Sequence, residues 1–388
     1  MNIKSWKAWR VLAIGFILLS ILAGFPLSSK GAEPIKIGVI QPITGPIAFD
    51  GQNQVKAIEL AVEKINSEGG VLGRQIKLII EDGKALPTES KSAALKLIVQ
   101  DKVCAILGCW ASSATLAVMP LLDEQHIPMI NGTSTSDKIT NPNTPGWYWT
   151  FRLLAPHQIT AEDVVPALVK LGFNKDMGYL AFSNEWGRNV VPNFKRQFEK
   201  FNVKDVFEEY FDAGTMDLMP LFSRAKAKGV KALFLNGDTL ALSIQTKQSY
   251  EAGMGGIPRV LVMSGDMKQI TSNAGKEAAE GVFQIDYYHP NVDNPGNKEL
   301  TPLWRKKYPD QMTYQAQASG YSQGKLIARA IEMAKSDNPA AIRDALEKIQ
   351  MDTPFGLTKF DKFHQATPFH VINQAKDGKP VLVWWSGR

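Results

Sequence analysis

Hydroxyl-bearing residues gather in two short stretches of the 388-residue sequence, and their chemistry suits the binding of a carboxylate. Each stretch follows an apolar run, at the expected start of a helix or in the loop after a strand. The free N–H groups and the positive dipole end of a helix N-terminus attract anions, and nearby hydroxyls add further donors. These hydroxyl residues are Ser112, Ser113, Thr133, Ser134 and Thr135.

The later part of the sequence offers the opposite charge, because Asp238 and Asp266 also follow apolar runs. Trp110 and Trp186 lie in similar stretches and would supply flat apolar walls. A small zwitterion, held by hydroxyls on one side and by an acid on the other, fits these residue types. Each residue also has a structural interpretation, since Ser, Thr and Asp often cap helices and Trp is often largely buried. Their convergence after apolar runs in both halves favours binding.

The segments that position these residues alternate between short apolar runs and helical patterns. Residues 35–40 are apolar, and Val55, Ile58 and Val62 then recur at the spacing of one helix face. Continuous apolar runs are typical of parallel strands covered by helices on both faces, and ligands bind beyond the carboxyl ends of such strands. Further runs lie at 76–82, 103–108, 127–132, 177–185, 230–237 and 259–265. The pattern predicts two α/β units of similar build.

The N-terminus has the composition of a secretory signal peptide. A basic segment at residues 1–10 precedes an uncharged apolar run at residues 11–25. That run is shorter than the roughly 20 residues that a membrane-spanning helix needs, and an uncleaved anchor is the alternative. We predict cleavage near residue 32 and export to the periplasm or beyond. No lipid anchor is expected, because no cysteine lies near the end of the signal.

Charge, cysteine and histidine usage narrow the function further. Because residues 1–32 carry four basic residues and no acids, about +2 of the formal net charge of +6 belongs to the remaining chain. No basic cluster with interleaved aromatic residues supports nucleic-acid binding. Cys104 and Cys109 would lie roughly 16 Å apart along a strand, too far for a disulfide. The five histidines are scattered and form no metal-binding motif.

Three stretches carry a family resemblance: IKIGVIQPITGPIAFDGQ, NSEGGVLGR and ILGCWASSATLAVMPLLDEQHIPMINGTSTSD. The chain resembles, over nearly all of its length after the signal, the branched-chain amino-acid-binding proteins (leucine, isoleucine and valine type) of ABC importers. The resemblance implies a type I periplasmic binding protein, in which two Rossmann-like α/β lobes with parallel-sheet cores are joined by a three-crossing hinge. It places the signal peptide at 1–32, lobe 1 at 33–152 plus 286–362, and lobe 2 at 153–285 plus 363–388.

The resemblance also implies roles for individual residues. Ser112 and Thr135 correspond to the hydroxyls that receive the ligand carboxylate. Thr133 corresponds to a backbone donor, and Ser113 lies beside it. Asp266 aligns approximately with the acid that pairs with the α-ammonium group of an amino acid.

Other positions depart from the pattern of the leucine binders. Trp186 stands where relatives often carry a tyrosine that stacks on the ligand, and Asp238 stands where leucine binders have an aromatic residue. Phe49 and Asp50 lie in the first loop, where an aromatic residue touches the ligand side chain. Because of these departures the ligand is left open among another amino acid, an amide and an aromatic acid.

From this resemblance we predict an exported solute-binding protein that holds an amino acid, or a related small carboxylate, between its lobes. Such a protein is a monomer that uses no cofactor, catalyses no reaction and delivers its ligand to an ABC permease in the inner membrane. A sensor domain of the same fold is one alternative. A receptor of that kind would continue into a membrane helix beyond Arg388, where the sequence ends, so a free carrier is expected.

A serine hydrolase is the second alternative, because residues 320–324 spell GYSQG and both His364 and His370 follow. In α/β-hydrolases this motif occupies a sharp turn between a strand and a helix. Here no apolar run precedes the motif, and helical periodicity continues through Ser322. We expect Ser322 to lie within a helix and the two histidines to be loop residues near a crossing between the lobes.

Overall fold

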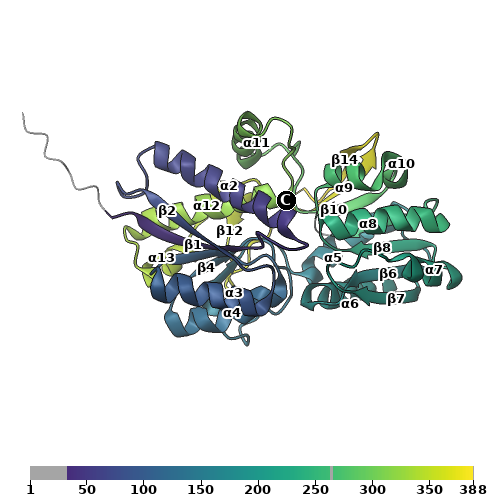
Figure 1. The fold of residues 1–388 in the computed structure, drawn as a ribbon, viewed down its shortest axis with the longest axis horizontal. Coiled ribbons are helices and arrows are strands. Elements are labelled where there is room, and N and C mark those ends of the chain that lie inside the picture. The colour runs from purple at the N-terminus through teal and green to yellow at the C-terminus, as the bar shows by residue number, and fades with distance from the viewer. Residues whose placement is uncertain (1–32, 263–264, 388) are drawn as a thin grey trace, which may run out of the picture. The chain divides into compact units, whose positions relative to one another are not determined.

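Two β-sheets, each covered by helices on both faces, form the protein in the computed structural model, which describes residues 33–262 and 265–387 (Figure 1). The predicted signal peptide and its cleavage point lie outside these described residues. Pro34–Arg388 forms one compact unit. Within the described ranges, no helix is long and apolar enough to cross a membrane.

The first sheet has five parallel strands in the order β2-β1-β3-β4-β5. Its strands are β1 (Ile35–Gln41), β2 (Ile76–Asp82), β3 (Ala105–Gly108), β4 (Met129–Asn131) and β5 (Thr150–Arg152). The first four coincide with predicted apolar runs, β1 extending one residue beyond its run, whereas β5 is too short to give a recognisable run. Cys104 and Cys109 flank β3 as free, buried thiols, as predicted.

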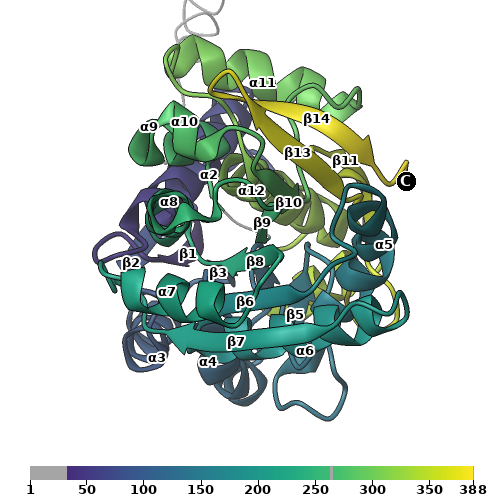
Figure 2. The same cartoon turned by 90° about the vertical axis from the view of Figure 1, so that its right-hand side faces the viewer.

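The second sheet has the order β14-β13-β10-β9-β8-β6-β7, and the five strands from β10 to β7 are parallel (Figure 2). The antiparallel strands β13 and β14 extend one edge. The strands are β6 (Met177–Phe182), β7 (Asp205–Phe211), β8 (Ala232–Asn236), β9 (Arg259–Val262), β10 (Phe283–Asp286), β13 (Val371–Lys376) and β14 (Lys379–Trp385). A separate antiparallel pair consists of β11 (Gln350–Thr353) and β12 (Gly356–Lys359).

Helices cover both faces of the first sheet because its strands are apolar on both sides. Val39 of β1 packs in the cluster that contains α2 and α12, and the next residue, Ile40, packs with α3 and α4. The helical segments of this lobe are α2 (Ala48–Ser67), α3 (Pro87–Leu95), η1 (Lys96–Gln100), α4 (Ser112–Gln125), η2 (Trp147–Trp149), α11 (Pro295–Lys307), α12 (Gln315–Ala334) and α13 (Pro339–Leu346).

The second sheet is covered in the same way. Phe234 of β8 packs in the cluster that contains α5 and α6, and Leu235 packs with α7, α8 and α9 on the opposite face. The helical segments of this lobe are α5 (His157–Lys170), α6 (Glu185–Glu199), α7 (Met219–Ala227), α8 (Thr239–Ser249), η3 (Tyr250–Met254), α9 (Met267–Ala274) and α10 (Lys276–Ala279). Two lobes with parallel-sheet cores are the predicted fold class.

The chain passes between the sheets three times, after β5, after β10 and after β12. Arg152, which is fully buried at the end of β5, ties the first passage to the third, because its Nε donates to Gln365 Oε1 at 2.5 Å. Its other guanidinium nitrogens donate to Ser136 O at 2.5 Å and Thr140 Oγ1 at 2.7 Å. The lobe limits at 33–152 plus 286–362 and at 153–285 plus 363–388 stay predictions.

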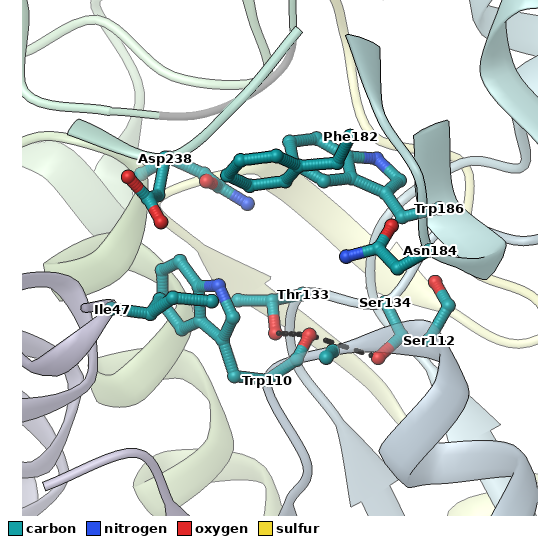
Figure 3. Close-up of a pocket in the computed structure, with 11 residues that line it drawn as sticks. Ile47, Trp110, Ser112, Thr133, Ser134, Phe182, Asn184, Trp186 and Asp238 are labelled. Carbon is teal, nitrogen blue, oxygen red and sulfur yellow. Dashed lines mark hydrogen bonds between the residues drawn. The ribbon is translucent and has the colours of Figure 1, made fainter. Parts of the chain in front are cut away.

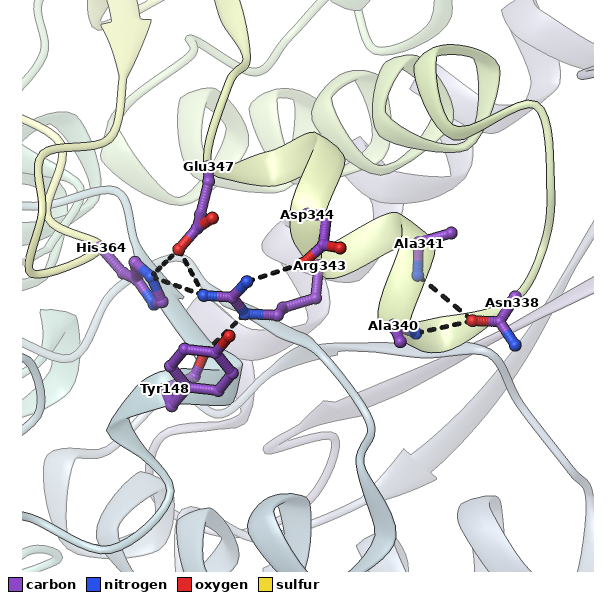
Figure 4. Close-up of polar contacts among 8 residues, drawn as sticks. All are labelled: Tyr148, Asn338, Ala340, Ala341, Arg343, Asp344, Glu347 and His364. Atoms are coloured by element: carbon purple, nitrogen blue, oxygen red, sulfur yellow. Dashed lines mark hydrogen bonds and ion pairs between the residues drawn. The ribbon is translucent and has the colours of Figure 1, made fainter.

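The third passage is held by a polar cluster around Arg343 of α13 (Figure 4). The Arg343 guanidinium lies 3.5 Å from the centre of the Tyr148 ring and pairs with Glu347. His364 Nε2 lies 3.2 Å from Glu347 Oε1. His370 bonds instead to Asp163 at 2.8 Å. Both histidines therefore belong to contacts near a crossing, as predicted.

The GYSQG motif is explained by helix packing. Ser322 lies inside α12 and its hydroxyl donates to the backbone oxygen of Ala318 at 2.6 Å. Gly320 and Gly324 allow α12 to approach α2 closely. A Cβ on Gly320 would lie 2.3 Å from the backbone oxygen of Gln54, a distance at which the helices would have to separate.

We therefore expect Gly320→Ala to lower the free energy of unfolding by about 1–3 kcal/mol, the usual cost of overpacking, despite the better helix propensity of alanine. Urea unfolding followed by circular dichroism measures the change. Gly256→Ala is the control, because nothing lies within 4 Å of its added Cβ. Equal stability of the two variants would contradict this packing role.

Candidate ligand-binding site

One pocket lies at the carboxyl ends of strands from both sheets, where α/β proteins bind ligands (Figure 3). It contains about 420 Å³ of empty space, including the part that opens to solvent. Residues after β1, β3 and β4 line it from the first lobe, and residues at or after the ends of β6 and β8 line it from the second. The lining residues are Ile47, Trp110, Ala111, Ser112, Thr133, Ser134, Phe182, Asn184, Trp186, Asp238 and Gln315.

The N-terminus of α4 forms one polar end of this pocket. Its N-cap residue is Ala111, which provides no side-chain hydrogen bond to the first turn. The first intrahelical acceptor, Ala111 O, is bonded by Thr115 N at 2.9 Å, so the preceding amides have no partner within the helix. By contrast, α6 and α8 are capped by the side chains of Asn184 and Asp238. The amides of α4 that have no partner within the helix, together with its positive dipole end, suit an anion.

Ser112 adds a hydroxyl donor at this end. Its Oγ is almost fully buried and accepts a hydrogen bond from Ser136 N at 3.3 Å. No residue in the described part of the chain accepts the proton of this hydroxyl, so it can be donated to a ligand. The loop behind it is fixed, because the Thr133 and Ser134 hydroxyls donate to Trp110 O at 2.9 and 3.0 Å.

Asp238 forms the opposite polar end, from the second lobe. One carboxylate oxygen caps α8 by accepting from Ala241 N at 2.9 Å, and the side chain is only 2% exposed. Burial, together with the negative charge of Asp50, raises the pKa of Asp238 to about 7. No ion pair with a described cationic side chain offsets its charge. A donor or a cation on a ligand would supply the missing partner.

Asp50, close to Asp238, is held by bonds from both lobes. Its Oδ1 accepts from the hydroxyls of Thr239 and Tyr314, each at 2.7 Å, and its Oδ2 accepts from Thr239 N at 3.1 Å. Burial nevertheless raises its pKa. The carboxylate of Asp50 therefore joins α2 to the starts of α8 and α12, whereas Asp238 faces the pocket.

Aromatic rings form the sides of the pocket. Figure 3 shows Trp110 on one side of the space and Phe182 with Trp186 on the other. The rings of Phe182 and Trp186 pack edge to face, with their centres 6.2 Å apart. Flat apolar walls of this kind favour a flat or apolar ligand body.

The structure brings half of the ten predicted site residues together in this pocket. They are Trp110, Ser112, Thr133, Trp186 and Asp238. Ser113 is not in its lining. The Thr135 hydroxyl instead bonds to His157 Nε2 at 2.7 Å, and burial lowers the pKa of that histidine to about 4.

The remaining predicted residues lie around other cavities or contacts. Asp266 caps α9 through Lys268 N and Gln269 N, and burial raises its pKa to about 6. It lines two other cavities, one of which also includes Phe49. Phe49 is 39% exposed and stacks on Tyr314. Asp50 makes the contacts described above.

Sequence reasoning missed several lining residues. Ala111 lies beside the predicted Ser112, and Asn184 is the N-cap residue two positions before the predicted Trp186, whereas Ser134 had been named among the hydroxyls without a role of its own. Phe182, the last residue of β6, could have been found from its place at a strand end. The remaining missed residues are Ile47 and Gln315. Among the described residues, no group of three or more His, Cys, Asp or Glu side chains could hold a metal ion.

Comparison with known proteins places the fold. A family model described as "Periplasmic binding protein" matches residues 34–379. A leucine-, isoleucine-, valine-, threonine- and alanine-binding protein of Pseudomonas aeruginosa is 27% identical over 342 residues, covering 88% of this chain and 89% of that protein.

Two solved structures have similar folds. The branched-chain amino acid transporter substrate-binding protein of Streptococcus pneumoniae, in complex with isoleucine, has a TM-score of 0.81 and 23% identity, covering 91% of this chain and 99% of that chain. A solute-binding protein of R. palustris, in complex with benzoate, has a TM-score of 0.82 and 19% identity, covering 91% and 96%. These matches confirm the predicted resemblance and fold class.

The raised pKa of Asp238 gives a pH prediction. Because its folded-state value of about 7 exceeds the ordinary 3.8, the folded protein holds this proton more tightly than the unfolded chain. Its contribution to stability is therefore full at low pH and is lost as the pH rises through about 7. Asp238→Asn keeps the cap and cannot ionise, so it should gain stability relative to the wild type between about pH 4 and 7.

Urea unfolding of the ligand-free proteins at several pH values measures this difference. A difference that stays constant with pH would show that the Asp238 carboxylate is not desolvated as the structure indicates.

Proposed function

We propose, because the chain belongs to the family of periplasmic binding proteins, that it is an exported solute-binding protein of an ABC importer. Its ligand is a small organic carboxylate, an amino acid or a related acid, enclosed between the lobes and delivered to a permease. One observation carries this proposal. The uncapped N-terminus of α4 with Ser112 and the buried carboxylate of Asp238 lie in the same pocket.

The mechanism follows from where the donors and the acid lie. The ligand carboxylate first binds the amides of α4 and the Ser112 hydroxyl on the first lobe. The second lobe then closes, which brings Asp238 to a donor group and Trp186 to the body of the ligand. Charge-assisted hydrogen bonds strengthen as water leaves the closed pocket. Binding thus shifts the population towards the closed form that the permease would recognise.

The relatives support an acid as the ligand. The P. aeruginosa protein is named for amino acids, and the two solved structures hold isoleucine and benzoate. All of these molecules carry a carboxylate, whereas only the amino acids carry an amine. The carboxylate end is therefore the shared feature, and the group that faces Asp238 is particular to this chain.

The family consists of binding proteins and not enzymes, as the sequence predicted. Capture and release of a ligand change no covalent bond, so the proposed function requires no catalytic group in the pocket. The predicted signal peptide, monomeric state and permease partner complete the proposal, and each is open to separate measurement.

Ser112→Ala should weaken the binding of a carboxylate ligand by about tenfold to a hundredfold, because a hydrogen bond to a charged group is worth about 1.5–3 kcal/mol. Isothermal titration calorimetry measures the affinity. The acid to be titrated is found first from its effect on the melting temperature, since a ligand that binds only the folded form raises it.

Ser113→Ala is the matched control, since this neighbouring serine lies outside the pocket lining and its loss should change the affinity little. If both variants bind as tightly as the wild type, the carboxylate site lies elsewhere in the protein.

A further inference from the structure

The two polar ends of the pocket are carried by helices that cover different sheets. Ser112 begins α4, which covers one face of the first sheet, while α2 covers the other. Asp238 begins α8, which covers one face of the second sheet, while α6 covers the other. Ser112 and Asp238 therefore reach the pocket from different lobes, on helices that cover different sheets.

Contacts between the lobes fix each end separately. At the Ser112 end, Ser136 donates its N–H to Ser112 Oγ at 3.3 Å and its hydroxyl to Glu185 Oε1 of α6 at 2.9 Å. At the Asp238 end, the neighbouring Thr239 is bonded to Asp50 of α2. The first lobe thus meets α6 at one end of the pocket and α8 at the other.

Aromatic rings occupy the stretch between the ends. In Figure 3, Asp238 and Ser112 lie at opposite sides of the pocket, with the rings of Trp110 and Phe182 between them. A ligand that reaches both ends must pass between these rings. Its middle part is therefore apolar and flat.

An α-amino acid does not match this arrangement with its two charged groups, because its carboxylate and ammonium are attached to the same carbon atom. We propose that the ligand is an elongated, flat monocarboxylate with a hydrogen-bond donor at the end opposite its carboxylate, such as an aromatic acid with a para-amino or para-hydroxyl group. This inference rests on the proposed function and names the class of acid that the same site takes.

The Asp238 end selects against other long acids. A purely apolar end would leave the buried carboxylate of Asp238 with only the backbone amides at the start of α8 as donors. A dicarboxylate would place a second negative charge beside Asp238 and Asp50. Burial also raises the pKa of Asp238 to about 7, and a donor on the ligand stabilises the ionised form.

Three probes test this inference by calorimetry on the mature protein: benzoate, 4-aminobenzoate and leucine. We expect 4-aminobenzoate to bind about tenfold more tightly than benzoate, because its amine donates to Asp238, and leucine to bind more weakly than 4-aminobenzoate. In Asp238→Asn the preference for the amino compound over benzoate should fall to near one. Asparagine can still cap α8, and unfolding curves confirm that the variant is folded.

Each other outcome overturns the inference. Tighter binding of leucine than of 4-aminobenzoate, or a para-amino preference that survives in Asp238→Asn, would show that the donor does not face Asp238. Either result is compatible with the proposed function if Ser112→Ala still lowers the affinity for the ligand. If no acid in this set and no amino acid binds the wild type, the proposed function fails and the inference fails with it.

Discussion

The carboxylate of Asp238 is buried in a pocket without a cation from the described chain, and this imbalance determines what the pocket can hold. A desolvated carboxylate is costly unless a donor or a cation reaches it. Across the pocket, α4 presents amides that no side chain caps. One end therefore offers a carboxylate that no cation pairs with and the other offers amides that lack an acceptor, and a single ligand that carries a donor and a carboxylate would satisfy the two ends together.

The rest of the fold keeps these two ends in place. Parallel strands in both sheets bring the loops after β3, β4, β6 and β8 to the same pocket. On the first lobe, Asn131 fixes the loop by accepting from Ser134 N at 2.9 Å and donating to its hydroxyl at 3.1 Å. On the second lobe, Asn184 and Asp238 cap their helices and line the pocket at once. For these two residues, capping a helix and lining the pocket are therefore not alternatives.

The positions of most parallel strands and of the loops after them were predictable from the sequence, because the strands of a parallel sheet are buried on both faces and form continuous apolar runs. Such runs located β1 to β4, β6, β8 and β9, and the rule that ligands lie beyond strand ends nominated the loops of Trp110, Ser112 and Trp186. Strand β7 was not recognised, since its charged residues lie at the sheet edge. The GYSQG match had no catalytic meaning, because its glycines serve the contact between α2 and α12.

Other features depend on contacts between distant segments. Asp238 and Asp266 have the same local pattern of an acid that caps a helix, and only the placement of α8 and α9 puts one of them in the pocket. Thr135, like Ser112, carries a hydroxyl just after a strand, yet its hydroxyl is hydrogen-bonded to His157. Gln315 reaches the pocket from the start of α12, far along the chain from the other lining residues.

The most direct test of the account is a crystal structure of the mature protein with the acid that binds it most tightly. The account predicts a ligand carboxylate oxygen within hydrogen-bonding distance of Ser112 Oγ, at the start of α4, and a donor of the same molecule at the Asp238 carboxylate. A ligand whose carboxylate lies away from α4, or which occupies one of the cavities beside Lys268 instead, would contradict it.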